Sequence, residues 1–402
     1  MTHVGPASKA GAWRAVVGFG LVSLFADMVY EGGRSIYGPL LGSLGASALV
    51  VGLVTGLGEA MALVLRLFSG AWADRSRAYW PITIVGYGMT AVCVPLLALS
   101  PGLGAAGLTV ASLLILAERT GKAVRSPSKS ALLAQVAQQV GGGRGFGVHK
   151  ALDEVGAFAG PLLVAAILAT TGSLSTGLAW LVVPGAVAMG LLFWLRGRVP
   201  EPTPSEEPTT TWWRDALGAG LGRPFFLFAG CAGLATAGLV TFGVIGFHLE
   251  RAQVLPLAAI PVAYAVGQAA SAGVALVTGF SYDRVGARVL YGLPVLVTLV
   301  PVLAFTRTPW VAVAGVAVWG AANGLQDSTV KALVADLVPS GRRATAYGVF
   351  AAIQGAAAIT GGAVAGWLYE VSIPALVAVV AVTQLAALVL LALTLRVSTR
   401  AR

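Results

Sequence analysis

Ionisable side chains lie at helical spacing inside two long apolar stretches of the sequence. In the stretch 15–37, Asp27, Glu31 and Arg34 stand at i, i+4 and i+7, so they share one narrow face of a helix. The same spacing continues over three turns of the stretch 107–134, at Glu118, Lys122, Arg125 and Lys129. A carboxyl group among cations in an apolar setting could take up and release a proton, and excess cations could bind an anionic solute.

These residues belong to a larger set of charged side chains in apolar stretches, most of them in the first half of the chain. The candidates for substrate or proton handling are Asp27, Glu31, Arg34, Glu59, Glu118, Arg119, Lys122, Arg125, Asp153, Asp327 and Lys331. Charge is unfavourable within a bilayer, so a charged residue there is a functional candidate. A structural alternative stays open, in which the charges neutralise one another and hold neighbouring helices together. Because the second half contributes only Asp327 and Lys331, we expect binding and proton chemistry mainly in the first half.

The elements that carry these residues are apolar segments long enough to cross a membrane. Hydrophobic residues make up 57% of the 402 residues and charged residues 10%, whereas soluble proteins carry about 25% charged residues. Segments of about 20 apolar residues, enough for ~30 Å of hydrocarbon, recur along the whole chain. They lie at 15–37, 47–69, 80–100, 107–134, 145–169, 175–195, 224–247, 257–279, 287–305, 309–336, 344–367 and 373–396. The sequence therefore predicts an all-α polytopic membrane protein with twelve transmembrane helices.

The distribution of basic residues predicts the orientation in the membrane. On this layout almost all loop Lys and Arg face the side of the two termini, and only Arg251 and Arg307 face the other side. Cytoplasmic loops are enriched in Lys and Arg, so both termini of this multi-pass plasma-membrane protein are predicted to be cytoplasmic. The net charge of +10 follows from this topology and from attraction to anionic lipid, and it requires no nucleic-acid partner.

The two halves of the chain repeat one short pattern. The pattern Gly-x-x-x-Asp-Arg follows the second apolar segment and again the eighth, at Gly70, Asp74, Arg75 and at Gly279, Asp283, Arg284. A polar stretch, 196–223, separates the halves. The predicted organisation is an N-terminal six-helix bundle (1–195), a cytoplasmic linker (196–223) and a C-terminal six-helix bundle (224–402). Such pseudo-symmetric halves are typical of transporters that rock two bundles about a central site.

The repeated Gly-x-x-x-Asp-Arg pattern resembles the signature loop of the major facilitator superfamily. Weaker matches to that superfamily's motifs in the fourth and fifth helices stand at Arg119 and Gly121, and at Gly156, Gly160 and Pro161. One departure is that the first-half loop continues Arg75-Ser-Arg77-Ala, without the usual glycine. The resemblance implies that the six residues of the repeated pattern form a cytoplasmic gate. It also implies a bacterial branch whose substrates are mostly unassigned, and hence a bacterial inner membrane.

The expected function is secondary active transport of a small anionic or zwitterionic solute by alternating access. The glycine cluster Gly141-Gly-Gly143 lacks the Gly-Lys-Ser/Thr ending of a nucleotide-binding loop, so the proton gradient is the expected energy source. Symport and antiport both stay open. Proton-driven efflux of hydrophobic drugs or other xenobiotics is the alternative, because such exporters also keep one or two carboxylates in their cavity.

An enzyme, a channel and a sensor fit the sequence less well than a carrier does. A membrane-embedded enzyme would need a clustered His/Asp metal site or a nucleophile–base pair, and the sequence pattern suggests neither. No cofactor is predicted. The expected partners are a small-molecule substrate, protons and the lipid bilayer, with the chain acting as a monomer.

Asp27 and Glu31 are the predicted site of the proton chemistry. Two carboxyl groups one helical turn apart in a low-dielectric setting do not both ionise easily. One of them is therefore expected to hold a proton until Arg34 or a cation of the stretch 107–134 approaches. Asp153 is the third candidate proton carrier.

Overall fold

The computed structural model describes three ranges of the chain, in which all regular secondary structure is helical: 9–201, 221–338 and 343–400. The chain forms two compact units, termed unit 1 and unit 2. Unit 1 contains the described residues of 1–34 and 65–208, and unit 2 those of 35–64 and 209–402. Residues 202–220 of the predicted linker lie outside the described ranges.

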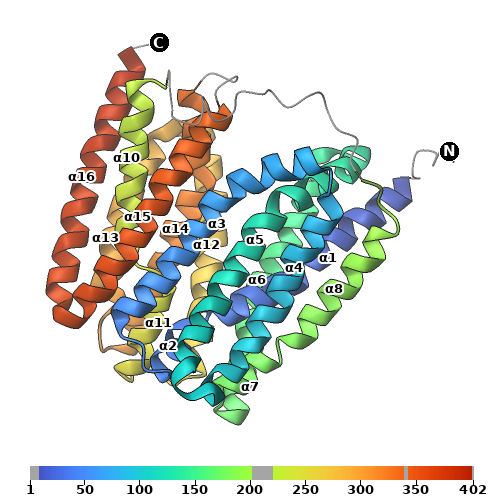
Figure 1. Cartoon of the computed structure of the whole chain (residues 1–402). Helices are drawn as coiled ribbons and strands as arrows, with labels where there is room; N and C mark the ends of the chain where they lie inside the picture. Colours follow the sequence, from blue (N-terminus) through green and yellow to red (C-terminus); the bar gives the residue numbers. More distant parts are fainter. Residues whose placement is uncertain (1–8, 202–220, 339–342, 401–402) are drawn as a thin grey trace. The chain divides into compact units, whose positions relative to one another are not determined.

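The helices follow one another along the chain as shown in Figure 1. Unit 1 contains α1 (Lys9–Arg34), the second part of α3 (Ala48–Ser76), α4 (Tyr79–Leu96), η1 (Leu97–Ala106), α5 (Gly107–Ala137), η2 (Gln138–Val140), α6 (Gly142–Thr171), α7 (Leu174–Ala179) and α8 (Val182–Arg196). Unit 2 contains α2 (Tyr37–Ser43), the first part of α3, α10 (Arg223–Gly238), α11 (Phe242–Arg251), α12 (Ala259–Val285), η3 (Gly286–Tyr291), α13 (Gly292–Ala304), α14 (Pro309–Leu337), α15 (Arg343–Val371) and α16 (Ile373–Arg400).

Nine helical segments within the described ranges are long and apolar enough to cross a membrane. Two of these segments are long enough for two crossings each: Tyr79–Val140, with 62 residues, contains α4 and α5, and Ala259–Ala304, with 46 residues, contains α12 and α13. Helix α14, with 29 residues, is also long enough to cross a membrane. The predicted all-α polytopic fold with twelve membrane helices is thus confirmed.

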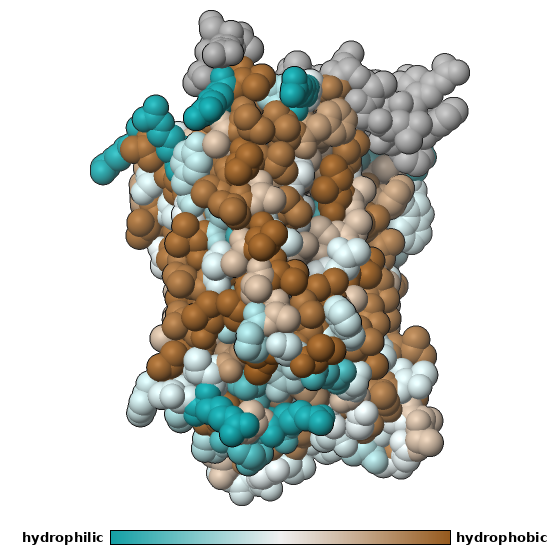
Figure 2. All heavy atoms as spheres, turned by 90° about the vertical axis from the view of Figure 1, so that its left-hand side faces the viewer, coloured by the Kyte–Doolittle hydropathy of each residue, from teal (hydrophilic) through white to brown (hydrophobic). Residues whose placement is uncertain are grey.

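One face of α16 is both apolar and exposed. Its side chains recur every three or four residues and are between 38% and 68% exposed, at Val379, Val382, Leu385, Val389 and Leu393. Figure 2 shows a broad hydrophobic surface on the side of the molecule that it presents, with hydrophilic residues gathered at the two ends. A continuous apolar surface of this kind is unfavourable in water and suits contact with lipid.

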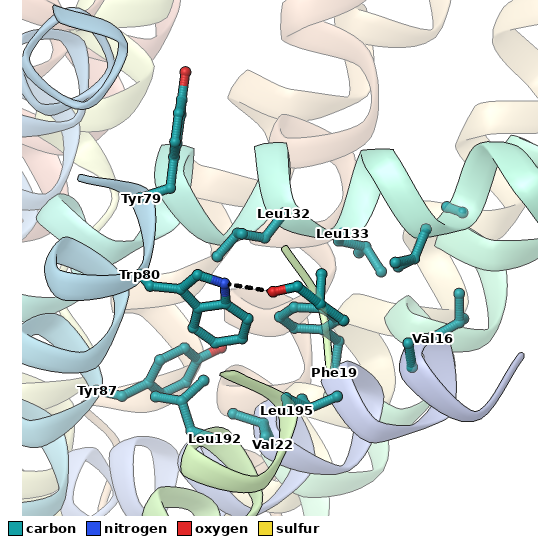
Figure 3. Packing of buried hydrophobic residues seen from close by; sticks show 14 of the residues in the cluster. Val16, Phe19, Val22, Tyr79, Trp80, Tyr87, Leu132, Leu133, Leu192 and Leu195 are labelled. Atoms are coloured by element: carbon teal, nitrogen blue, oxygen red, sulfur yellow. Dashed lines mark hydrogen bonds between the residues drawn. The ribbon is translucent and has the colours of Figure 1, made fainter. Parts of the chain in front are cut away.

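The core of unit 1 is built around Trp80 at the start of α4 (Figure 3). The ring of Phe19 from α1 stacks on the Trp80 indole, with ring centroids 5.9 Å apart. The indole Nε1–H donates a hydrogen bond of 2.9 Å to the backbone carbonyl of Val199, just beyond α8. Leucines of α5 and α8 complete the cluster, at Leu132, Leu133, Leu192 and Leu195. Trp80 therefore joins four helices and holds the chain where it leaves α8.

We expect Trp80→Phe to lower the melting temperature of the purified protein. Phenylalanine keeps the stacking partner for Phe19 but leaves the buried Val199 carbonyl without its donor, which costs about 1–3 kcal/mol. The matched control is Trp72→Phe, because Trp72 is 57% exposed and the same substitution there should be nearly neutral. Equal melting temperatures for the two variants would contradict the structural role of the Trp80 hydrogen bond.

Helices α1 and α6 pack with their backbones in contact. A Cβ atom at Gly156 of α6 would overlap the carbonyl oxygen of Leu24, and one at Gly160 would overlap that of Met28. Only glycine permits such an approach, which is a common way for helices to pack in lipid. The contact fixes the distance between the polar faces of α1 and α6.

Residues 35–64 pack within unit 2 through a second set of glycine contacts. A Cβ atom at Gly52 of α3 would overlap the carbonyl oxygen of Gly362 in α15. The hydroxyl oxygens of Thr55 and Thr241 lie 2.8 Å apart, which links α3 to the residue that precedes α11. The predicted bundles 1–195 and 224–402 assign residues 35–64 to the N-terminal bundle, and this division stays a prediction.

The predicted segment 224–247 is interrupted between α10 and α11. Trp319 of α14 donates its indole N–H to the carbonyl of Val240 at 3.0 Å. The Val240 carbonyl, which lies at the break between the two helices, therefore has a hydrogen-bond donor. The rings of Phe242 and Tyr264 pack against the same indole, with centroids 5.4 and 5.8 Å away. These aromatic side chains therefore stabilise the break.

Candidate functional site

Buried and half-buried ionisable side chains gather between α1, α5 and α6 of unit 1. This charged cluster consists of Asp27, Glu31 and Arg34 of α1, Glu118, Arg119, Lys122, Arg125 and Lys129 of α5, and His149 and Asp153 of α6. It contains every predicted substrate or proton residue that lies in unit 1. Polar side chains of α4 border it at Tyr87 and Thr90.

Ion pairs join the charged face of α1 to that of α5. Glu31 Oε1 lies 3.9 Å from Lys122 Nζ, and Asp27 Oδ1 lies 3.7 Å from the guanidinium of Arg125. Arg34 lies 3.8 Å from the second carboxylate oxygen of Glu31. These ion pairs bring the charged faces of α1 and α5 together, and the roles of the residues stay predictions.

Tyr30 lies among three cations of the cluster. Lys122 Nζ is 3.2 Å from the centre of the Tyr30 ring, Arg119 Cζ is 4.7 Å away and Arg34 Cζ is 5.8 Å away. Arg119 also donates a short hydrogen bond to the Tyr30 hydroxyl. Cations are attracted to the face of an aromatic ring, so Tyr30 helps to hold positive charge here. Its spacing from Asp27 and Arg34, at i+3 and i−4, could have identified it from the sequence.

Thr90 links the most buried acid of the cluster to Arg125. The hydroxyl of Thr90 donates to a carboxylate oxygen of Glu118 at 3.4 Å and accepts a short hydrogen bond from Arg125. The Arg125 guanidinium also lies over the Tyr87 ring, 4.2 Å from its centre. Arg125 is thereby held between α4 and the carboxyl group of Asp27. Neutral residues such as Thr90 carry no signal in the sequence, because they are common in membrane helices.

Lys129, His149 and Ser23 form the end of the cluster. His149 Nε2 lies 2.9 Å from the Ser23 hydroxyl and 3.2 Å from Lys129 Nζ. The Ser23 hydroxyl in turn lies 3.2 Å from that of Tyr87. The sequence spacing predicts Lys129 on the same face as Lys122, but it does not predict its contact with the histidine.

Asp153 connects the cluster to an exposed ion pair on α6. Its carboxyl group lies within hydrogen-bond reach of that of Asp27 in α1, and it accepts a hydrogen bond of 3.0 Å from Lys150 Nζ. Lys150 also pairs with Glu154 at 2.6 Å, and the Lys150 side chain is 65% exposed. Asp153 therefore lies between the buried part of the cluster and solvent-accessible charge.

The remaining predicted substrate or proton residues lie in unit 2. Glu59 is half-buried on α3, and Asp327 is exposed on α14. Lys331 also belongs to α14, but its side chain lies outside the described part of the structure. Among the described residues, no group of His, Cys, Asp and Glu could hold a metal ion.

The two predicted gate patterns belong to the last turns of helices, where loops were expected. Helix α3 extends to Ser76 and α12 to Val285, so both patterns are helical: Gly70, Asp74, Arg75 and Gly279, Asp283, Arg284. This corrects the expected ends of the second and eighth segments, because polar residues can continue a helix beyond its apolar part. The Asp74 carboxylate accepts a hydrogen bond of 2.9 Å from the Tyr79 hydroxyl, which ties the end of α3 to α4.

The family model described as Major Facilitator Superfamily matches residues 19–306 and 262–402 of the chain. An uncharacterized protein of Mycobacterium tuberculosis strain H37Rv is 51% identical over 395 residues, which cover 97% of this chain and 95% of that protein. An uncharacterized MFS-type transporter of Methanocaldococcus jannaschii is 27% identical over 365 residues, with 88% of each chain covered.

Solved structures of transporters have a similar fold. A mutant of the nucleoside transporter NupG gives a TM-score of 0.79 at 15% identity, covering 95% of this chain and 99% of that one. A POT family transporter in complex with 5-aminolevulinic acid gives a TM-score of 0.71 at 12% identity, with 96% of each chain covered. At these identities the likeness shows the fold alone.

Proposed function

Because the chain belongs to the Major Facilitator Superfamily, it is a membrane transporter, and we propose that it moves a small anionic or zwitterionic solute coupled to the proton gradient. It would do so by alternating access, from the plasma membrane of a bacterium, as a monomer with both termini in the cytoplasm. Family membership makes the chain a transporter and not an enzyme. The solute class and the coupling are argued from the charged cluster of unit 1.

An excess of cations in the cluster is the observation that supports an anionic or zwitterionic solute. Its five cationic side chains are those of Arg34, Arg119, Lys122, Arg125 and Lys129, and its four carboxylic side chains are those of Asp27, Glu31, Glu118 and Asp153. A buried cation without a compensating charge is unfavourable. A carboxylate or phosphate group on the solute would supply that charge.

Arg34 and Lys122 are the cations that we expect to touch the solute. Their side chains are 20% and 25% exposed, whereas those of Arg119 and Arg125 are only 3% and 6% exposed. Both accessible cations flank Glu31 at 3.8 and 3.9 Å, which is longer than a hydrogen bond. An anionic group of the solute could reach these two cations through the exposed part of their side chains.

Proton coupling would use carboxyl groups of the same cluster, with Asp27, Glu31 and Asp153 as candidates. A buried carboxyl group gains or loses a proton when the distance to a neighbouring cation changes. Rocking of the two predicted bundles would expose these carboxyl groups to one side of the membrane and then to the other, and the residues of the two gate patterns would open and close the cytoplasmic side. Coupled uptake and coupled export use the same chemistry.

A ligand screen by thermal shift tests the proposed solute class. The purified protein is heated with anions, amino acids, sugars and lipophilic drugs, and a bound ligand raises the melting temperature. We expect the largest increase with an anionic or zwitterionic compound, and counterflow of that compound in proteoliposomes. Stabilisation by lipophilic cations alone would contradict this proposal and favour drug efflux.

Lys122→Gln is expected to weaken the binding of that compound by about tenfold to a hundredfold. The substitution removes one charge-assisted contact, which contributes about 1.5–3 kcal/mol. The matched control is Arg198→Gln, because Arg198 is exposed beside Trp194 at the end of unit 1. The measurement is the ligand concentration that gives half of the maximum thermal shift, and equal values for the two variants would exclude Lys122 from the binding site.

A further inference from the structure

We propose that Asp27 and Asp153 share one proton and that this acid pair is the proton-binding site of the transporter. The inference rests on the proposed proton coupling and goes beyond it, because it names the pair of atoms that hold the proton. It also differs from the pair Asp27 and Glu31 that the sequence spacing suggests. The argument depends on the packing of α1 against α6.

The close approach of α1 and α6 brings the two carboxyl groups together. Asp27 lies between Leu24 and Met28, whose carbonyl oxygens touch the glycines of α6. Asp153 lies one turn before the first of these glycines, Gly156. At an ordinary helix separation the two short side chains would not meet, so the glycine contact is what forms the pair.

A hydrogen bond between these two neighbouring carboxyl groups requires a proton. An ionised carboxylate only accepts hydrogen bonds, so one member of a hydrogen-bonded pair must be protonated. Lys150 donates to Asp153 at 3.0 Å, which favours the ionised form of Asp153. Asp27 Oδ1 lies 3.7 Å from Arg125, too far for a hydrogen bond. We therefore assign the proton to Asp27, which donates it to Asp153.

Charged groups from three helices surround the pair and would balance its charge after deprotonation. Besides Glu31, they are Lys122, Arg125 and Lys129 of α5, and His149, Lys150 and Glu154 of α6, while Tyr87 of α4 lies beyond Arg125. When the proton leaves Asp27, two neighbouring carboxylates remain. The nearby cations Arg125 and Lys150 then each balance the negative charge of one carboxylate.

Glu31 has surroundings that differ from those of the acid pair. It lies between Arg34 and Lys122, at 3.8 and 3.9 Å, and these are the cations expected to meet the solute. Glu31 would thus keep the solute site in charge balance, while Asp27 and Asp153 carry the proton. The two tasks fall on different carboxyl groups of the same cluster.

Infrared difference spectroscopy of the purified protein tests this pair without any substrate. The spectrum of each variant is subtracted from that of the wild type at neutral pH, in the C=O stretching region of protonated carboxyl groups. We expect a lost band in Asp27→Asn and in Asp153→Asn. In either variant the new amide donates to the remaining carboxylate, so the shared proton is no longer needed.

Glu31→Gln and Glu154→Gln are the matched controls, and both should keep the band. A band that survives in both aspartate variants, or that disappears in Glu31→Gln instead, would overturn the assignment, as would its absence from the wild type. Testing the two aspartates separately guards against one variant that does not fold. An intact band in a protein without proton-driven transport would refute the proposed coupling and leave the acid pair standing.

Discussion

Replacing Arg119 by leucine is expected to lower the free energy of unfolding by about 3–5 kcal/mol. Glu118 beside it is fully buried, and its carboxylate lies 3.8 Å from the Arg119 guanidinium. Removing the arginine leaves this carboxylate without its nearest cation, and it also removes the donor to the Tyr30 hydroxyl. The measurement is the midpoint of denaturant-induced or thermal unfolding in detergent.

The double variant Glu118→Gln/Arg119→Leu provides the control for this effect. Once the carboxylate is gone, the loss of its cation should matter much less, so the double variant is expected to be more stable than Arg119→Leu alone. Arg198→Leu serves as a surface control, since Arg198 is exposed. If Arg119→Leu and Arg198→Leu unfolded at the same midpoint, the pairing of Arg119 with Glu118 would not contribute to stability.

The membrane fold was largely predictable from the sequence, because apolar length alone limits what a segment can do in a bilayer. The predicted segments correspond to the observed membrane helices, and the resemblance to the major facilitator superfamily is confirmed by the family match. The ends of helices and the interruptions within them were harder to predict from the sequence. The extension of α3 to Ser76 and the break before α11 depend on tertiary contacts such as those of Tyr79 and Trp319.

The candidate site was predictable where a single helix carries the pattern. The spacing of Asp27 and Glu31 placed them on one face of α1, and the spacing of Lys122 and Arg125 placed them on one face of α5. Contacts between helices were not predictable in the same way. The meeting of Asp27 with Asp153 depends on backbone contact at Gly156 and Gly160, which no spacing within one helix reveals.

The second large effect concerns transport, and here helical spacing and observed contacts predict different results. Asp27→Asn is expected to abolish accumulation of the solute driven by a pH gradient, while exchange of solute for solute continues. The asparagine cannot release a proton, so the gradient has no group to act on, but Arg34 and Lys122 still bind the anion. The measurement is uptake into proteoliposomes against external pH, with the compound identified by thermal shift.

Three variants measured together decide which carboxyl groups carry the proton. If Asp27 and Glu31 share it, as their spacing suggests, Asp27→Asn and Glu31→Gln should both lose gradient-driven accumulation, and Asp153→Asn should keep it. If the acid pair at the contact between α1 and α6 carries the proton, Asp27→Asn and Asp153→Asn should lose gradient-driven accumulation. Glu31→Gln should then keep accumulation, with an altered KM. A purely structural role for all three would lower melting temperatures and leave the pH dependence of uptake unchanged. Because Glu31 is held between two cations and Asp27 against another carboxyl group, we expect the second pattern.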